Sequence, residues 1–236
     1  MKAADYHGLG YASGGSADIT EFRFRGVGNR FTGAGGARVA ELSSFSQHSW
    51  QLMPSEKAVV FLQNHDTQRV DGVSYGDGAL HRLANVWMLA QPYGYPVVMS
   101  SYAFDRGSQS GRDAGPPARE ATLRCASRME LAVPGEWVCE HRDPWIVAML
   151  SFRRAVAGTD FGRTWDNGAN AMAFARGTQG FVAINAGSTS LTTAILTGMT
   201  AGTYCDLLTG GRAAAGCAGR AVTVGAYGSI ALTLDA

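Results

Sequence analysis

The chain has 236 residues, 46% of them hydrophobic, so it can form a large buried core and is not a disordered protein. Its 20 basic and 19 acidic residues nearly cancel, and no run of Lys or Arg offers the basic stripe that nucleic acid binding requires. No apolar run is long enough to cross a bilayer. We therefore expect a globular protein that has neither a nucleic acid nor a membrane as its partner.

The first part of the chain predicts short strands and a helical turn. Residues 19–24 alternate between apolar and polar side chains, which is typical of a strand, and a short helix is expected near residues 38–43. The run at residues 58–62 is apolar throughout and includes β-branched and aromatic side chains. Such a run predicts a strand buried on both faces, as in a parallel sheet.

Helices alternate with strands over the next hundred residues. Apolar side chains recur over residues 80–87 with the spacing of one helical face, and this helix must end before Pro92. A second buried strand is expected at residues 96–100, followed by a long polar loop. Asp143-Pro144 then has the pattern of an N-cap and first helical residue, in a helix that ends at Gly158. This alternation is typical of parallel βα units.

Beyond Gly158 the pattern changes to short strands separated by Gly, Ser or Asn. The expected strands lie at residues 171–175, 181–185, 191–196, 203–207, 221–224 and 230–234. Their length and spacing predict an antiparallel β-sandwich. We therefore expect an α/β domain over residues 1–158 and an all-β domain over residues 159–236, packed closely because no flexible linker separates them.

The four cysteines form two pairs that are local in the sequence, Cys125 with Cys139 and Cys205 with Cys217. Neither pair has the spacing of metal ligands. Closing a loop of this length with a disulfide stabilises a fold by roughly 3 kcal/mol, in an oxidising compartment. The spacing thus favours two disulfides, and four buried free thiols are the alternative.

The candidate functional site is the triplet Asn64-His65-Asp66, which follows the predicted strand at residues 58–62. In barrels of βα units, the carboxyl ends of the strands carry the catalytic residues. A carboxylate beside an imidazole suits acid-base catalysis, recognition of sugar hydroxyls or metal binding. The plain alternative is that Asn64 and Asp66 only form the turn after the strand.

The residues around this triplet, Phe61-Leu62-Gln63-Asn64-His65-Asp66-Thr67-Gln68-Arg69, resemble the fourth signature region of the glycoside hydrolase clan that contains the α-amylases. Other motifs resemble animal and actinobacterial α-amylases and follow the order of that family. They are Thr20-Glu21-Phe22-Arg23-Phe24, Pro92-Tyr93-Gly94-Tyr95, Val98-Met99-Ser100-Ser101-Tyr102, Gly115-Pro116-Pro117, Trp137-Val138-Cys139-Glu140-His141-Arg142 and Ala201-Gly202-Thr203-Tyr204-Cys205-Asp206. The resemblance extends from about residue 5 to the C-terminus.

The resemblance implies a fold in which a (β/α)8 TIM barrel is followed by a C-terminal β-sandwich. The predicted strands at residues 20–24, 58–63 and 96–100 would then be barrel strands six, seven and eight. Members of the family hydrolyse internal α-1,4-glucosidic bonds of starch and glycogen with retention of configuration. Retention requires a nucleophilic carboxylate and a proton-donating carboxylic acid roughly 5 Å apart.

By this resemblance, Asp66 is a third carboxylate that stabilises the distorted sugar of the transition state, and His65 binds the same sugar. Asn64 matches an asparagine of the anion site in chloride-activated members. The motifs that carry the nucleophile and the general acid have no counterpart in this sequence. We therefore expect an α-amylase fragment that is inactive alone and whose partners are an α-glucan and the N-terminal barrel half.

The resemblance also implies calcium, with ligands mainly in the half of the barrel that has no counterpart here, so no metal ligand is expected in this chain. Chloride-dependent members have an arginine directly after the Ser-Ser-Tyr motif, where this chain has Ala103 and only Arg106 nearby. This replacement argues against a chloride site. A secreted protein is implied as well, although the first seven residues lack the apolar region of a signal peptide.

A function of another class is a non-catalytic carbohydrate-binding or interaction protein that keeps the sandwich and part of a sugar cleft. Aromatic side chains that stack on sugars would favour it. Residues 171–234 contain Phe174, Phe181, Tyr204 and Tyr227 as their aromatic residues. Binding to insoluble starch would separate this hypothesis from that of an enzyme fragment.

Overall fold

The computed structural model describes residues 18–69, 72–104, 116–117 and 124–234. Its parallel strands are β1 (Ile19–Thr20), β2 (Ala58–Val60) and β3 (Tyr95–Pro96), and its α-helices are α2 (Gly26–Thr32), α3 (Ala79–Ala90) and α5 (Pro144–Ala155). The antiparallel strands are β4 (Phe161–Asp166), β5 (Ala171–Arg176), β6 (Gly180–Asn185), β7 (Leu191–Leu196), β8 (Gly202–Cys205), β9 (Arg212–Ala213), β10 (Gly216–Cys217), β11 (Ala221–Val224) and β12 (Ser229–Leu234). Short 3-10 helices lie at Phe22–Arg25, Ala34–Gly36, Val39–Ser44, Ser55–Lys57, Tyr75–Asp77, Met129–Leu131, Glu140–Arg142, Leu207–Thr209 and Ala226–Gly228.

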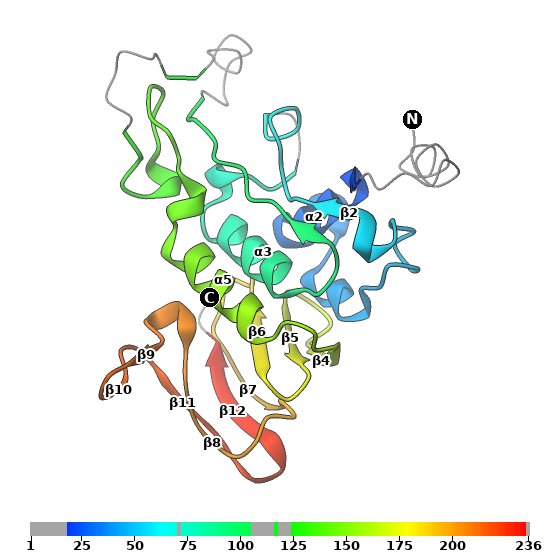
Figure 1. Ribbon diagram of the computed structural model, residues 1–236, viewed down its shortest axis with the longest axis vertical. Coiled ribbons are helices and arrows are strands. Elements are labelled where there is room, and N and C mark those ends of the chain that lie inside the picture. The colour runs from blue at the N-terminus through cyan, green and yellow to red at the C-terminus, as the bar shows by residue number, and fades with distance from the viewer. Residues whose placement is uncertain (1–17, 70–71, 105–115, 118–123, 235–236) are drawn as a thin grey trace.

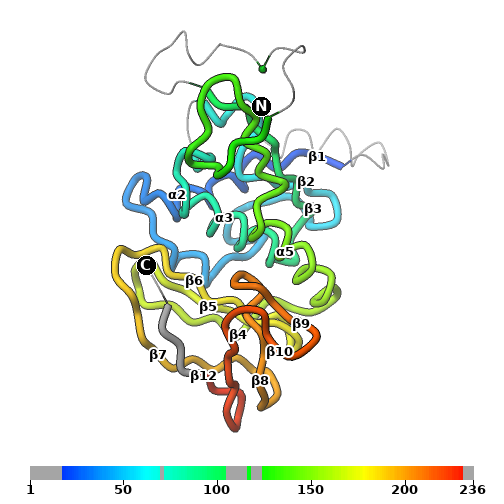
Figure 2. The backbone as a smooth tube through the Cα atoms, turned by 90° about the vertical axis from the view of Figure 1, so that its left-hand side faces the viewer, coloured from blue at the N-terminus to red at the C-terminus, as the bar shows by residue number. Residues whose placement is uncertain are grey.

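The α-helices and the parallel sheet occupy one end of the molecule, and the antiparallel strands form the other (Figure 1). From the side, α2, α3 and α5 lie on one side of β4, β5 and β6, while β7, β8 and β12 lie on the other (Figure 2). The parallel sheet has the order β1-β2-β3, with Ile19 opposite Ala58 and Val59 opposite Tyr95. The predicted parallel arrangement is therefore confirmed in these residues.

The predicted strand at residues 19–24 is wrong beyond Thr20. Glu21 is fully buried, and its carboxylate accepts hydrogen bonds from the backbone N–H of Arg23 at 3.0 Å and of Met53 at 2.8 Å. The first of these bonds caps the 3-10 helix that begins at Phe22. A buried carboxylate requires such donors, and here they turn the chain out of the sheet and into α2.

The other two parallel strands are also shorter than predicted. Pairing along β2 ends at Val60, although Phe61 and Leu62 remain buried. After β3, the backbone N–H of Val97 still donates to the carbonyl of Val60, but Ser101 exchanges its hydrogen bonds with the segment around Glu140. The apolar runs correctly indicated burial, and the partner segments decided where the strand pairing stops.

Both long helices are confirmed. Helix α3 ends at Ala90, two residues before Pro92. Helix α5 is capped by Asp143, whose carboxylate accepts the N–H of Trp145 at 3.0 Å, and it has Pro144 as its first residue. Gly158, which follows the helix, has a φ of +76° that favours glycine over other residues.

The six strands predicted beyond Gly158 are found within two residues of their expected ends, and all pair in antiparallel fashion. Three strands were not predicted. Strand β4 is interrupted by a bulge between Gly162 and Trp165, so its alternation of apolar and polar residues is broken. Strands β9 and β10 have two residues each, too few to show a periodic pattern.

Strand β5 is buried along its whole length. Met172 and Phe174 belong to the main hydrophobic core, which also contains buried side chains of α2, α3 and α5. Ala173 faces the opposite way and packs with Ile195 and Ile230 between the antiparallel sheets. The main core therefore continues across the boundary expected at residue 158, which fits the close packing predicted for the two parts.

Two arginines, the buried Arg176 and the half-buried Arg153, secure this junction through backbone carbonyls. Arg176, at the end of β5, is 2% exposed and donates to the carbonyls of Ala90, Val156 and Thr159. Arg153 donates to the carbonyls of Leu89, Gln91 and Gly94. These acceptors lie at or just after the C-terminal ends of α3 and α5, where free carbonyls and the helix dipole favour a cation.

Burial lowers the pKa of the Arg176 guanidinium, and the nearby charge of Arg153 lowers it further. Arginine nevertheless remains protonated in proteins, so the group keeps its full set of donors. Gly180 completes the junction, because a Cβ at this position would lie 2.5 Å from a methyl group of Val156 and 2.8 Å from the ring of Phe152. Strand β6 can thus approach α5 only with glycine here.

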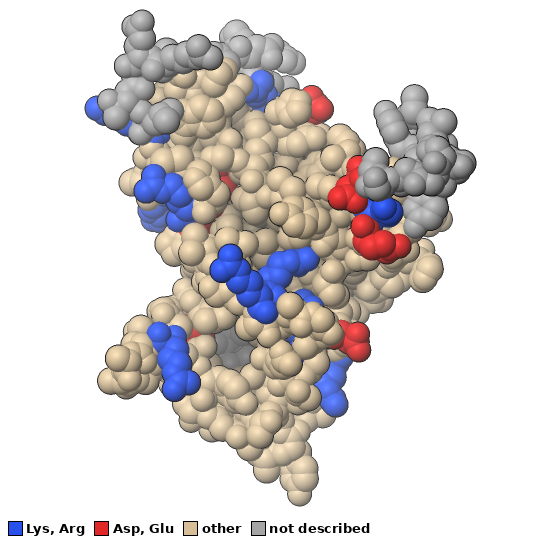
Figure 3. Space-filling model, in the orientation of Figure 1, with Lys and Arg blue, Asp and Glu red and all other residues tan. Residues whose placement is uncertain are grey.

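Both predicted disulfides are present, joining Cys125 to Cys139 and Cys205 to Cys217, so the alternative of free thiols is wrong. Lys and Arg side chains lie in separate groups on the face shown in Figure 3. None of the helices in the described ranges combines the length and apolar character needed to cross a membrane.

We predict that Arg176→Met lowers the free energy of unfolding by about 2 to 4 kcal/mol, because buried carbonyls lose charged donors. Denaturant unfolding with both disulfides intact measures the effect. The matched control is Arg154→Met, an exposed position of α5, which should change the free energy of unfolding by less than about 0.5 kcal/mol. Equal losses in the two variants would contradict the role assigned to Arg176.

Candidate functional site

The triplet Asn64-His65-Asp66 forms the turn that follows the buried end of β2. The side-chain oxygen of Asn64 accepts hydrogen bonds from the N–H groups of Asp66 and Thr67, both at 3.1 Å, and from the hydroxyl of Thr67 at 3.0 Å. Asn64 therefore shapes the turn, in agreement with the alternative hypothesis that this residue serves the turn after the strand.

His65 and Asp66 are held by this turn but remain accessible. Their side chains are 81% and 66% exposed, and His65 Nε2 lies 3.3 Å from Asp66 Oδ1. The carboxylate and the imidazole therefore point to solvent at the carboxyl end of a parallel strand. This pair can hydrogen-bond a hydroxylated ligand from two sides, because a carboxylate accepts hydrogen bonds and an imidazole donates or accepts them.

Arg69 connects the turn to the chain that follows β3. Its guanidinium donates to the hydroxyl of Tyr102 and lies 4.9 Å from the centre of the Tyr102 ring and 5.5 Å from that of Phe104. The ring of Tyr102 in turn packs edge-on against Trp137. The turn that bears Asp66 is thus tied to a neighbouring segment by a cation resting on aromatic rings.

Glu140 also connects these two segments, through its buried carboxylate. This residue has no exposed surface, and its carboxylate accepts the N–H of Ser101 at 2.8 Å and the amide of Gln63 at 3.3 Å. Gln63 directly precedes Asn64, and Ser101 directly precedes Tyr102. A single buried carboxylate therefore joins the chain segments that leave β2 and β3.

Burial raises the pKa of Glu140, and hydrogen bonds from Ser101 and the charge of His141 offset this only in part. Among the described residues, nothing donates to the buried Oε1 of Gln63. A protonated Glu140 carries an O–H donor, and a half-turn of the Gln63 amide would present Oε1 to it. The raised pKa and the unpaired oxygen are therefore consistent with each other.

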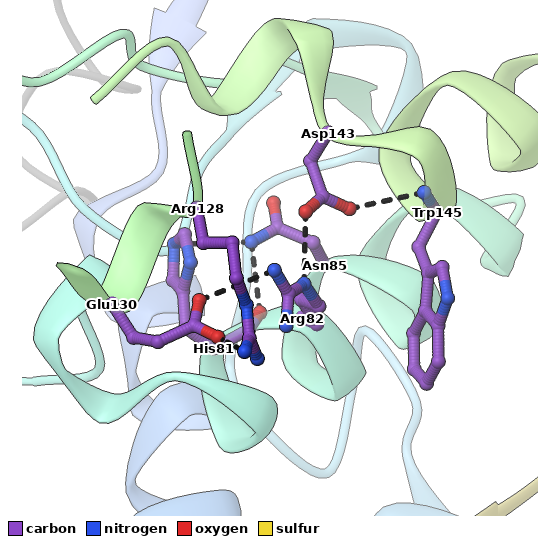
Figure 4. Close-up of polar contacts among 7 residues, drawn as sticks. All are labelled: His81, Arg82, Asn85, Arg128, Glu130, Asp143 and Trp145. Atoms are coloured by element: carbon purple, nitrogen blue, oxygen red, sulfur yellow. Dashed lines mark hydrogen bonds and ion pairs between the residues drawn. The ribbon is translucent and has the colours of Figure 1, made fainter. Parts of the chain in front are cut away.

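Figure 4 shows how the segment before α5 is fixed to α3. Arg82 of α3 lies between Asp143, at 2.8 Å, and Glu130, at 3.2 Å. Burial by itself lowers the pKa of Arg82, but these two carboxylates outweigh it and raise that pKa. Arg128 pairs with Glu130 as well. These ion pairs hold both ends of the segment that carries Glu140.

The resemblance implies calcium ligands mainly in the half of the barrel that has no counterpart here, and it argues against a chloride site because of Ala103. No cluster of three His, Cys, Asp or Glu side chains within the described ranges could hold calcium. Ala103 is 3% exposed and apolar, so this position offers an anion no charge. The other residue considered for chloride, Arg106, lies outside the described residues.

The sequence did not identify Gln63 or Glu140 as supports of the site. Both residues lie inside quoted motifs, but their burial and mutual contact join positions 77 residues apart in the chain. The signal that the sequence offers for Glu140 is its position between Cys139 and the helix start predicted at Asp143-Pro144. That signal alone does not indicate a partner.

Comparison with known proteins places these observations in a family context. The family model for the α-amylase C-terminal all-β domain matches residues 165–236. Pancreatic α-amylase 2a5 of Mus musculus is 36% identical over 97% of this chain and 46% of its own length. A pancreatic α-amylase of Homo sapiens is 35% identical over 93% of this chain and 44% of its own length. The chain thus spans about half the length of the curated relatives it matches.

Solved structures give the same result. A mutant of α-amylase I from Eisenia fetida in complex with maltohexaose superposes with a TM-score of 0.80 at 29% identity, covering 93% of this chain and 47% of that one. The wild-type enzyme superposes with a TM-score of 0.81 over 92% of this chain. The similarity therefore includes the parallel sheet and α-helices as well as the antiparallel strands.

We predict that Glu140→Gln changes the pH dependence of stability. The raised pKa means that folded wild-type protein keeps its proton to higher pH than the unfolded chain. The contribution of Glu140 to the stability of the wild type is thus fully present below the pKa that Glu140 has in the unfolded chain. It is lost as the pH rises through the higher pKa that Glu140 has in the folded protein. The free energy of unfolding of the variant minus that of wild type should therefore rise with pH and then level off.

Denaturant unfolding at a series of pH values measures this difference. Glu140→Ala serves as the control, because it also removes the titrating group but leaves the N–H of Ser101 without an acceptor. It should show the same rise with pH, displaced by a constant loss of about 1 to 3 kcal/mol. A difference that falls with pH for Glu140→Gln would show that Glu140 is stabilised in its charged form.

Proposed function

The chain belongs to the α-amylase family, whose members it matches over their C-terminal half, and we propose that it supplies sugar-contacting residues for retaining hydrolysis of internal α-1,4-glucosidic bonds in starch and glycogen. The observation that carries this proposal is the exposed His65–Asp66 pair at the carboxyl end of β2. Catalytic residues occupy this end of parallel strands in barrels of βα units.

Asp66 would accept hydrogen bonds from sugar hydroxyls and stabilise positive charge that develops on the sugar ring in the transition state. His65 would hydrogen-bond the same sugar. Retention also needs a nucleophile and an acid about 5 Å apart, and the family motifs that carry these two residues have no counterpart in this sequence. We therefore propose that this chain alone is not catalytic.

The fold of the relatives suggests how the chain is organised. We propose that β1, β2 and β3 correspond to strands six, seven and eight of a (β/α)8 barrel within residues 1–158, and that residues 159–236 are the C-terminal sandwich. Strands β1 and β3 each lack a second neighbour in the described residues. Because open edges of parallel strands favour pairing with another chain, a polypeptide that supplies the other barrel strands is the expected partner.

Two further parts of the proposal concern the compartment in which the protein occurs and the binding of calcium. Two disulfides in a chain of this size are typical of an oxidising compartment, which supports secretion. Calcium, if the complete protein holds it, would be bound by residues outside those described here. The hydrogen bonds proposed for His65 and Asp66 are made by their own side chains and involve neither calcium nor chloride.

A non-catalytic carbohydrate-binding role has one observation in its favour. Tyr227, in the turn before β12, is 98% exposed and has a φ of +62°. An exposed aromatic ring can stack on a sugar, and the strained backbone is retained at a modest cost. This candidate places the glucan at the sandwich instead of at Asp66, so the two proposals predict different variants to lose binding.

We predict that purified, soluble chain releases no reducing sugar from starch above the rate of a buffer blank. The physical reason is that Asp66 stabilises a transition state which a nucleophile and an acid must first produce. A reducing-sugar assay at several protein concentrations measures this. Activity that scales with protein concentration and disappears in Asp66→Asn would contradict the proposed division of roles.

We predict that maltohexaose binds at His65 and Asp66 and shifts the ring signals of His65 in NMR spectra of the chain, while those of His48 stay in place. Asp66→Asn should weaken binding about tenfold or more, because hydrogen bonds to a charged acceptor are lost. Tyr227→Ala is the matched control and should bind like wild type. If only Tyr227→Ala lost binding, the carbohydrate-binding role would replace the enzyme proposal.

A further inference from the structure

A cavity of about 410 Å³ lies against the Cys125–Cys139 disulfide, and neither His65 nor Asp66 lines it. Both half-cystines line it, and each is partly exposed. Arg82, Arg128, Arg142 and Asp143 also form its wall. A small molecule can therefore reach the disulfide from this cavity, whose size falls within the range of ligand pockets.

The wall of the cavity carries excess positive charge. Arg82 pairs with Asp143 and Glu130, and Arg128 pairs with Glu130, as Figure 4 shows. In the described part of the chain no carboxylate pairs with Arg142, which is exposed. Among the described residues the cavity is thus lined by three arginines and one carboxylate, while Glu130 pairs with two of the arginines from outside the lining. The surplus positive charge favours an anionic ligand.

The guanidinium of Arg142 also touches the disulfide on one side only. Its Nη1 donates to Cys125 Sγ at 3.3 Å. A neighbouring arginine lowers the pKa of a thiol, so Cys125 is the sulfur better able to carry negative charge. In thiol–disulfide exchange the more acidic thiol leaves faster. An incoming thiolate should therefore attack Cys139 and expel Cys125.

We propose that the Cys125–Cys139 disulfide is a modification site for a small thiol that carries carboxylates, of the chemical class of glutathione. The carboxylates of the thiol are attracted to the arginines of the cavity, and the thiol loses its proton to solvent. The inference does not depend on the proposed function, because it uses none of the residues assigned to the glucan.

The exchange is balanced without a further oxidant or reductant. A sulfur lone pair of the incoming thiolate forms a bond to Cys139 Sγ while the Cys125–Cys139 bond breaks. The electron pair of that bond leaves on Cys125 Sγ, as a thiolate beside Arg142. The products are a mixed disulfide on Cys139 and a free Cys125, and a second thiol molecule can complete the reduction by attacking the mixed disulfide.

The first test uses the wild-type chain and reduced glutathione. After brief reaction, an alkylating reagent traps free thiols, and mass spectrometry of peptides locates both adducts. We expect glutathione on Cys139 and the alkyl group on Cys125. Glutathione on Cys125, an equal division between the two sulfurs, or reaction confined to Cys205–Cys217 would overturn the proposal.

The second test varies the charge beside Cys125. Arg142→Gln should slow attack by glutathione on Cys125–Cys139 about fivefold, the effect of one unit charge a few ångströms away in water. Arg142→Lys, the matched control, should retain most of the wild-type rate. The Cys205–Cys217 disulfide of the same molecule serves as reference and should react equally in all three proteins. An unchanged rate in Arg142→Gln would overturn the proposal.

Discussion

The burial of strand β5 on both faces is the constraint on which the rest of the structure depends. Alternate side chains of this strand enter two cores, Met172 and Phe174 toward the helices and Ala173 toward the second sheet. Arg176 lies on the same side of the strand as Met172, and its buried guanidinium requires hydrogen-bond acceptors. The carbonyls at the ends of α3 and α5 accept these hydrogen bonds. The positions of both helices on the sandwich follow from that requirement.

The candidate site depends on the opposite end of the same helices. Arg82 of α3 and Asp143 at the start of α5 form an ion pair that fixes the segment containing Glu140. Glu140 then joins Gln63 to Ser101, and so the segments leaving β2 and β3. Both Arg176 and Glu140 are buried and are bonded largely to backbone groups or an amide, so polar groups can hold the core together without matched ion pairs.

Much of the fold could be predicted from local patterns. Apolar spacing indicated α3, the Asp143-Pro144 pair marked the start of α5, and the short strands after Gly158 were recognised with ends correct to within two residues. The predictions failed where distant partners decide the outcome. Glu21 ends β1 because Met53 comes to its carboxylate, and β3 is short because the Glu140 segment takes the hydrogen bonds of Ser101.

By itself the sequence determined the two kinds of structure in the chain and the residues, His65 and Asp66, that mark the candidate site, and it favoured the cysteine pairs that the structure confirms. These features follow from periodicity, local loop closure and motifs of adjacent residues. Only the tertiary structure decided that Asn64 shapes the turn, that Glu140 supports it and that Arg142 lies beside one sulfur of a disulfide. Those roles depend on burial and on contacts between segments that are distant in the chain, which no local pattern of residues encodes.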